Sequence, residues 1–178
     1  VEDTRIRTTT LSRIDPRISS SIVSLSGGAI ESLVKSMPGV SSNNELSNTY
    51  SVRGGNYDEN LVYVNDIEIY RPFLLRSGQQ EGLSFLNSDM VSSILFSAGG
   101  FEAKYGDKMS SVLDIKYKKP TEFAGSVSGS LLGATAHLEG TSPDARWTYI
   151  IGVRQKSNSS LLGSLDTKGE YRPSFTDL

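Results

Sequence analysis

The chain has 178 residues, of which 37% are hydrophobic and 21% charged, and it contains no cysteine. This length is enough for one globular domain with a short appendage. Eighteen basic and 20 acidic residues give a net charge of −2, which excludes the basic field typical of nucleic-acid-binding proteins. The lack of cysteine excludes disulfides and thiolate metal sites. No apolar run approaches the length of about 20 residues that a membrane helix needs.

The first 20 residues show neither the apolar period of a helix nor that of a strand. Their basic side chains are Arg5, Arg7, Arg13 and Arg17. This composition predicts an extended arm over residues 1–24.

A short helix is predicted next. Ile30, Leu33, Val34 and Met37 occur at the spacing of one helix face. The helix must end at Pro38, because proline cannot continue the hydrogen-bond ladder. The opposite, exposed face is predicted to consist of Glu31, Ser32, Lys35 and Ser36.

Strand patterns follow the helix. Leu61–Val64 and Ile67–Tyr70 are rich in β-forming residues, and Asn65-Asp66 between them tolerates a positive φ. Together they predict a hairpin. Further strands are predicted at Tyr50–Arg53, Ile94–Phe96 and Val112–Tyr117.

The composition changes after Pro120. Within Phe123–Glu139, small or hydroxyl residues alternate with apolar ones, and a turn is predicted at residues 140–144. The next run places four large side chains on one face, namely Trp147, Tyr149, Ile151 and Val153. One apolar and one polar face are typical of a barrel wall in lipid. A half-buried hairpin of a soluble sheet gives the same spacing, so both interpretations stay open.

No catalytic or metal-binding constellation is predicted. Ser32 and Lys35 match S-x-x-K, but they lie on the polar face of the predicted helix, without the accompanying motifs. The single histidine, His137, has no orienting carboxylate at a recognisable spacing and no second imidazole to share a metal. The acidic residues near Asp58 and Asp66 lack the spacing of a calcium loop. We therefore expect a binding, gating or structural protein, with no enzymatic activity, metal or cofactor.

Four segments in one order resemble those of a known family. They are Ile30–Val40, ending in Pro-Gly-Val; Ser51–Gly55, containing Val-Arg-Gly; the hairpin Leu61–Ile67; and Ile94–Ile115. Over residues 25–118 they resemble the plug domain of TonB-dependent outer-membrane receptors, and Gly99–Gly106 is most similar to receptors of Bacteroidota. Asn65-Asp66 replaces the family's usual Asp-Gly, and no segment within Val1–Thr10 is similar to a TonB box.

The resemblance implies an α+β fold in two parts. Residues 25–120 would form a plug domain, a mixed sheet of about four strands with short helices. Residues 121–178 would form an antiparallel hairpin belonging to an outer-membrane barrel of about 22 strands. Phe123–Glu139 and Trp147–Lys156 would be its first two strands. The 58 residues after Pro120 are an incomplete wall, because bacterial barrels have at least about 8 strands of about 10 residues.

The resemblance also implies a function. The plug would occlude a barrel lumen and gate energised uptake of a ligand across the outer membrane of a Gram-negative bacterium, facing the periplasm and the lumen. Arg53 would contact carboxylates of the barrel wall, with Gly54 and Gly55 forming the bend beside it. Asn65 and Asp66 would form the apical turn of the hairpin.

Two loops, Asn56–Glu59 and Arg71–Gly82, would face the ligand. The candidate contact residues are Tyr57 and Arg76 within these loops and Tyr70, which directly precedes the second loop. The lipid-facing residues would be Trp147, Tyr149, Ile151 and Val153.

The implied partner is an enclosing outer-membrane barrel, with TonB and a surface lipoprotein as further candidates and no nucleic acid. Two alternatives stay open. In one, a separate plug-like protein stoppers another large outer-membrane channel, such as a secretion translocon. In the other, the chain is a soluble periplasmic binding module whose apolar hairpin face packs on residues 30–117.

Overall fold

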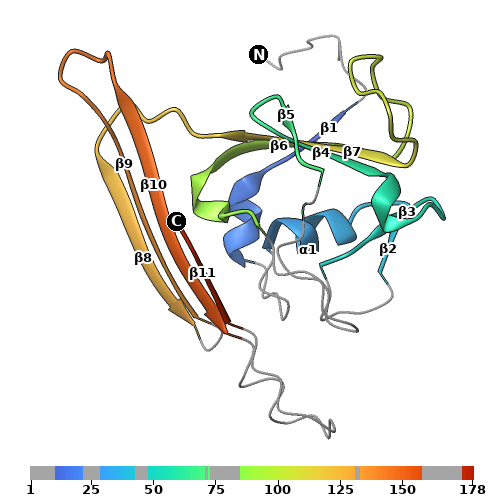
Figure 1. Ribbon diagram of the computed structural model, residues 1–178, viewed down its shortest axis with the longest axis horizontal. Coiled ribbons are helices and arrows are strands. Elements are labelled where there is room, and N and C mark those ends of the chain that lie inside the picture. Colours follow the sequence, from blue (N-terminus) through green and yellow to red (C-terminus); the bar gives the residue numbers. More distant parts are fainter. Residues whose placement is uncertain are drawn as a thin grey trace, which may run out of the picture. The chain divides into compact units, whose positions relative to one another are not determined.

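The computed structural model describes residues 11–21, 29–42, 48–70, 72, 85–130, 133–157 and 174–178. The chain divides into two compact units, Val1–Tyr117 and Lys118–Leu178. The first contains a mixed five-stranded sheet and the second an antiparallel four-stranded sheet (Figure 1). Within the described residues, no helix combines the length and apolar character needed to cross a bilayer.

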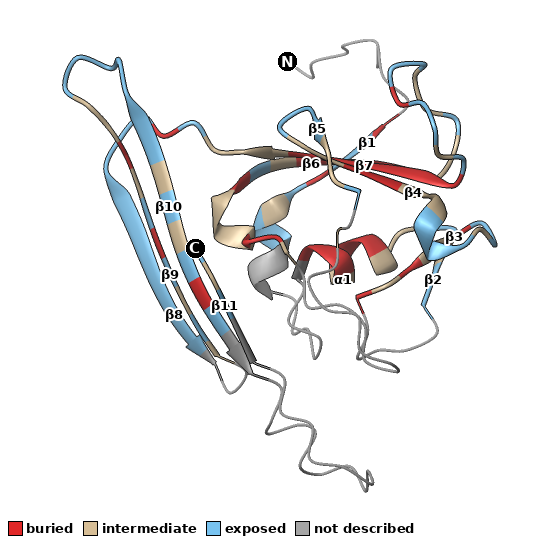
Figure 2. Cartoon of the chain, in the orientation of Figure 1, coloured by how far each residue is buried: buried red, intermediate tan, exposed pale blue. Residues whose placement is uncertain are grey.

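The sheet of the first unit has the strand order β1-β6-β7-β4-β5. Strands β4 and β7 are parallel, whereas the other three neighbouring pairs are antiparallel. The central strand β7 is the most continuously buried (Figure 2). The five strands are β1 (Ser12–Ile14), β4 (Asn60–Val64), β5 (Ile67–Glu68), β6 (Val91–Ser97) and β7 (Ser111–Tyr117).

The sheet has five strands, whereas the sequence predicted about four. The additional strand is β1. It lies within the predicted N-terminal arm, where Ser12 pairs with Phe96 and Ile14 with Ile94. Leu11 and Ile14 are each only 7% exposed. This part of the arm therefore belongs to the domain core, and the 3₁₀ helix η1 (Pro16–Ser21) follows it.

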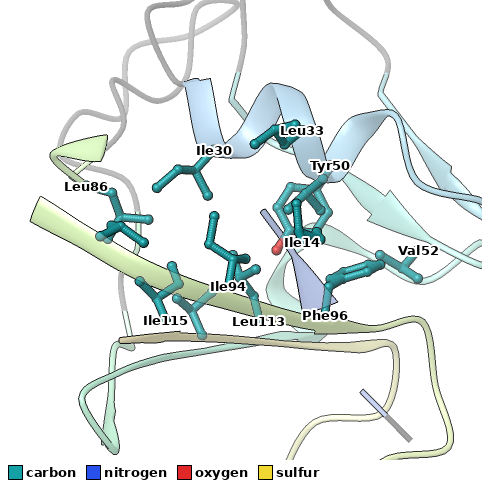
Figure 3. Packing of buried hydrophobic residues seen from close by; sticks show 13 residues of the cluster. Ile14, Ile30, Leu33, Tyr50, Val52, Leu86, Ile94, Phe96, Leu113 and Ile115 are labelled. Carbon is teal, nitrogen blue, oxygen red and sulfur yellow. The ribbon is translucent and has the colours of Figure 1, made fainter. Parts of the chain in front are cut away.

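Helix α1 (Ala29–Lys35) packs on one face of the sheet (Figure 3). Its residues Ile30, Leu33 and Val34 are buried against strands β6 and β7, as their spacing predicts. The prediction that Glu31 lies on an exposed face is wrong, because Glu31 is 3% exposed. Its carboxylate lines the same small cavity as Tyr50 in the core.

Two short pairings complete the first unit. Strands β2 (Val40–Ser41) and β3 (Ser51–Val52) form a two-stranded sheet. Asn65 and Asp66, with φ of 50° and 66°, turn the chain from β4 into β5. Positive φ at both central positions is the geometry of a two-residue hairpin turn. Two 3₁₀ helices, η2 (Tyr57–Glu59) and η3 (Ser88–Met90), precede β4 and β6.

A second, smaller cluster covers the other face of the sheet. Its buried members are Leu11, Leu61, Tyr105 and Val112. Tyr105 comes from the segment between β6 and β7, and Leu11 immediately precedes β1, so both of these segments shield the second face. The sheet is thus buried on both sides.

The second unit is an antiparallel sheet in the order β11-β10-β9-β8. The prediction of one strand over Phe123–Glu139 is wrong, because β8 and β9 pair with each other from Ala124–Glu139 to Ser130–Gly133. The strands are β8 (Ala124–Ser130), β9 (Gly133–Thr141), β10 (Thr148–Ser157) and β11 (Ser174–Asp177). The fold class is α+β with a following antiparallel sheet, as predicted.

Candidate functional site

The structure places most of the predicted site residues of the first unit in two groups. Arg53–Gly55 and Tyr57 lie where β4 and β7 begin and β6 ends. Asn65 and Asp66 lie at the opposite end of β4. We call the first group and the residues next to it the loop end. It comprises Arg53–Gly55, Tyr57–Glu59, Gly99–Gly100 and Ser110.

Arg53 is held in an unusual backbone conformation at the loop end. Its φ is 51°, and its N–H donates to the carbonyl of Gly39 over 2.8 Å. The side chain crosses two glycines: a Cβ added to Gly39 would lie 3.6 Å from Arg53 Cγ, and one added to Gly99 would lie 3.4 Å from Nη1. Arg53 is nevertheless exposed. The guanidinium is therefore seated on the domain while it remains open to an external anion.

Gly55 packs directly against a hydrogen-bonded pair. Ser110 Oγ donates to Glu59 Oε2 over 2.7 Å, and the backbone N–H of Ser110 donates to the carbonyl of Glu59 over 3.3 Å. A Cβ at Gly55 would lie 1.9 Å from Ser110 Oγ and 2.6 Å from Glu59 Oε2. A side chain at this position would therefore displace Ser110 and Glu59, so the bend beside Arg53 packs closely on the start of β7.

Asn60 ties the loop end to the core. Its Nδ2 donates to the carbonyls of Tyr50 and Tyr57, over 2.8 and 3.2 Å, and its Oδ1 accepts from Ser111 Oγ over 2.7 Å. Burial and the nearby Glu31 carboxylate raise the pKa of Tyr50. Glu31, Tyr50, Tyr57 and Asn60 line a cavity of about 10 Å³, which has room for one water and not for an organic ligand.

A buried carboxylate lies on the second face of the sheet. Asp114 is 3% exposed, and its Oδ2 accepts a 2.6 Å hydrogen bond from Tyr105 Oη. Burial and this hydrogen bond raise the pKa of Tyr105 to about 12. Lys116 Nζ lies 3.9 Å from Asp114 Oδ1 and also pairs with Asp66, whose pKa it lowers. Lys116 thus links the hairpin turn to the buried carboxylate.

Tyr105 has two further neighbours. Its ring meets that of Tyr63 edge to face, with 5.5 Å between centroids, and Lys104 Nζ lies 4.5 Å from its centroid. These contacts fix the segment between β6 and β7 across the second face.

His137 has an orienting carboxylate, contrary to the sequence prediction. Its Nε2 lies 2.9 Å from Glu139 Oε2, and its Nδ1 lies 3.3 Å from Ser126 Oγ. Lys118 Nζ lies 3.6 Å from the same oxygen of Glu139. Residues two apart on a strand share a face, which is the spacing that sequence reasoning overlooked. The network joins β8, β9 and the chain that leads into β8.

The second unit has two chemically different faces. The His137 network lies on one of them, and Arg154 on the same face donates to Asp177 through Nη2 over 2.6 Å. The other face exposes large apolar side chains. Those exposed by 40% or more are Phe123, Val127, Leu138, Trp147, Tyr149, Ile151 and Val153. Their lipid-facing role stays a prediction.

Two of the three predicted ligand-facing residues are described. Tyr57 is 38% and Tyr70 80% exposed, whereas Arg76 lies outside the described residues. Sequence reasoning missed Glu59, Ser110 and Asp114. Asp114 lies between the apolar residues Leu113 and Ile115, and a carboxylate in such a run is the signal of a buried polar residue.

Three comparisons relate the chain to known proteins. The sequence profile of the TonB-dependent receptor plug domain matches residues 8–112, more than half of the chain. A comparison with curated proteins found no match.

Among solved structures, the chain is similar to two variants of the ferric enterobactin receptor of Pseudomonas aeruginosa, both in complex with enterobactin. Both match with a TM-score of 0.55 and 16% identity, over 85% and 86% of the chain. The chain spans only 25% and 26% of the length of those receptors.

The matched family consists of receptors and not of enzymes, and its receptors are outer-membrane proteins of Gram-negative bacteria. The more specific similarity to Bacteroidota stays a prediction. The mixed sheet with a helix on one face is consistent with the profile match to the plug domain. The chain belongs to the family of TonB-dependent receptor plug domains.

Proposed function

We propose that the first unit closes the lumen of an outer-membrane β-barrel and gates energised uptake of a ligand, and that the second unit supplies strands to that barrel. One observation carries the proposal. Within one chain, a TonB-dependent receptor plug domain is followed by an antiparallel sheet with an exposed apolar face. A barrel wall needs such a face toward lipid and a polar face toward the lumen.

The order of elements supports a plug within its own barrel. Only residues 118–123 separate the end of β7 from the start of β8. Trp147, Tyr149, Ile151 and Val153 share one face of this sheet, as the lipid-facing side of a barrel wall requires. Neither a second channel nor a soluble module is needed to account for this sheet.

We propose that Arg53 anchors the plug to carboxylates of the barrel wall. Its exposed guanidinium lies across Gly39 and Gly99, and Gly54 and Gly55 form the bend beside it. An arginine seated in this way loses little conformational freedom when it binds a carboxylate. Such a polar contact can be exchanged for water when the plug moves.

The remaining partners follow from this function. TonB would supply the mechanical force that moves the plug, and it would reach the plug from the periplasm. A surface lipoprotein is a further candidate partner. Ligand contacts are assigned to the exposed Tyr57 and Tyr70 and to Arg76. The similarity to the enterobactin receptor is at 16% identity, so it supports the fold and carries no ligand.

Replacing Arg53 by alanine tests the anchor in the full-length protein. We expect cells carrying Arg53→Ala to become several-fold more sensitive to large antibiotics, because the plug loses a charge contact with the wall. The minimal inhibitory concentration measures the effect. Arg13→Ala is the matched control, since Arg13 is also exposed on the first unit. Equal sensitivity of both variants and the parent, at equal protein levels, would exclude Arg53 as an anchor.

A further inference from the structure

Lys116 lies between two carboxylates on the second face of the first unit. Lys116 and Asp114 are two residues apart on β7, so their side chains share this face. Lys116 Nζ pairs with Asp66 in the hairpin turn and lies 3.9 Å from Asp114 Oδ1. A hydrogen bond from nitrogen to oxygen spans about 2.7–3.2 Å. Lys116 is therefore bonded to Asp66, and Asp114 lies just beyond the reach of its ammonium group.

The two carboxylates differ in their exposure to solvent. The side chain of Asp66 is 85% exposed and that of Asp114 only 4%. Tyr105 donates to Asp114 Oδ2, but Asp114 Oδ1 has no hydrogen-bond partner among the described residues. An exposed ion pair adds little to stability, whereas a buried carboxylate oxygen without a hydrogen bond is costly. Lys116 thus pairs with the carboxylate that needs it less.

The hairpin turn does not depend on Lys116. The backbone N–H of Asn65 donates to the carbonyl of Ile115, and the N–H of Tyr117 donates to Asn65 Oδ1, each over 2.9 Å. These two bonds attach the turn to β7 on both sides of Lys116. The lysine side chain is 33% exposed and has a flexible four-carbon stem. Its ammonium group is thus able to leave Asp66 while the turn stays in place.

Lys104, a second cation near this face, already has partners of its own. Its Nζ lies 4.5 Å from the centroid of the Tyr105 ring and 3.5 Å from Glu102 Oε2. Both partners belong, like Lys104, to the segment between β6 and β7. Lys116, by contrast, lies on the strand that carries Asp114. It is therefore the cation positioned to neutralise Asp114 from within the sheet.

We propose that Lys116 alternates between Asp66 and Asp114, and that its position controls how firmly the segment between β6 and β7 is held. While Lys116 pairs with Asp66, opening of the Tyr105–Asp114 bond lets water reach a poorly satisfied carboxylate. Once Lys116 pairs with Asp114, both carboxylate oxygens are satisfied and opening becomes less favourable. A basic group that binds Asp66 from outside the first unit would release Lys116 and so tighten this segment. The alternation takes place within the first unit and does not require its proposed role as a plug.

Replacing Asp66 by asparagine tests this proposal in the full-length protein. The variant removes the exposed partner, and asparagine tolerates the positive φ of this position. Lys116 should then move to Asp114, so the amides of residues 101–110 should become at least about threefold better protected from hydrogen exchange. Mass spectrometry after hydrogen–deuterium exchange measures this protection. The direction is decisive, because the loss of an ion pair that only stabilises the turn would lower the protection.

Two further variants separate the movement of Lys116 from a general effect of charge. Glu68→Gln is the matched control, because Glu68 and Asp114 both pair with Tyr63 and so share the second face. Its replacement should change the protection by less than about twofold. In a Lys116→Met background, Asp66→Asn should have no effect.

Two results would overturn the proposal. Unchanged or lower protection in Asp66→Asn alone would show that Lys116 does not move to Asp114. A rise of equal size in the Lys116→Met background, or in Glu68→Gln, would assign the effect to net charge and not to the lysine.

Discussion

Replacing Gly55 by alanine should destabilise the first unit by about 2–4 kcal/mol, through overpacking and the loss of a hydrogen bond to a charged group. The added Cβ would lie 1.9 Å from Ser110 Oγ and 3.0 Å from Ser110 Cβ. Ser110 must then move, and its bond to Glu59 is lost. Urea unfolding followed by far-ultraviolet circular dichroism measures the change in the free energy of unfolding.

Gly54→Ala is the matched control for this prediction. Gly54 has a φ of 82°, and nothing lies within 4 Å of an added Cβ. Its replacement therefore costs only the left-handed backbone conformation, about 1 kcal/mol. A second change, Ser110→Gly, should relieve part of the Gly55→Ala effect. If Gly55→Ala is no less stable than Gly54→Ala, the packing at the loop end is not as described.

A charge on the apolar face of the second unit should be costly only in a membrane. We expect Val127→Arg to destabilise the protein in lipid vesicles by about 2–4 kcal/mol, the cost of arginine near the bilayer midplane. Val127 is 85% exposed, so the side chain loses almost no packing within the chain. Chemical unfolding of the vesicle-bound protein measures the difference.

Ser128→Arg, one residue further along β8, is the comparison for Val127→Arg. Ser128 lies on the polar face, where its Oγ lies 2.6 Å from Thr135 Oγ1. A charge there should cost about 1 kcal/mol or less, as for the loss of one hydrogen bond between neutral groups. If both variants lower the free energy of unfolding by a similar amount, the two faces of the sheet are in the same environment, which contradicts the prediction.

Elements specified by neighbouring residues were predictable from the sequence. The helix was predictable from the apolar spacing of Ile30, Leu33 and Val34, although it ends at Lys35, before Met37 and Pro38. The β4–β5 hairpin required only Asn65 and Asp66, both of which have positive φ. Strand β1 was not predictable in this way, because its partner β6 lies about 80 residues further along the chain.

The two strands within Phe123–Glu139 did leave a signal in the sequence. Apolar or small residues of the exposed face occupy odd positions up to Gly129 and even positions from Ala134 onward. A strand has a period of two, so this change of phase marks a hairpin and not one long strand.

The site could be predicted only in part. The Val-Arg-Gly segment indicated Arg53 as a site residue. The packing of its side chain on Gly39 and Gly99 depends on three separate turns and was not predictable. The pairing of Glu59 with Ser110 joins residues 51 apart, which no local spacing reveals. Long-range contacts of this kind are visible only once the sheet order is known.

Single-channel conductance tests most directly whether the first unit closes a pore. The full-length protein and a variant lacking residues 11–117 would be compared in planar bilayers, with circular dichroism confirming that the variant retains its β-structure. We predict that the parent conducts almost no current and that the variant forms a large, permanently open pore. Equal conductance of the two folded proteins would contradict the account.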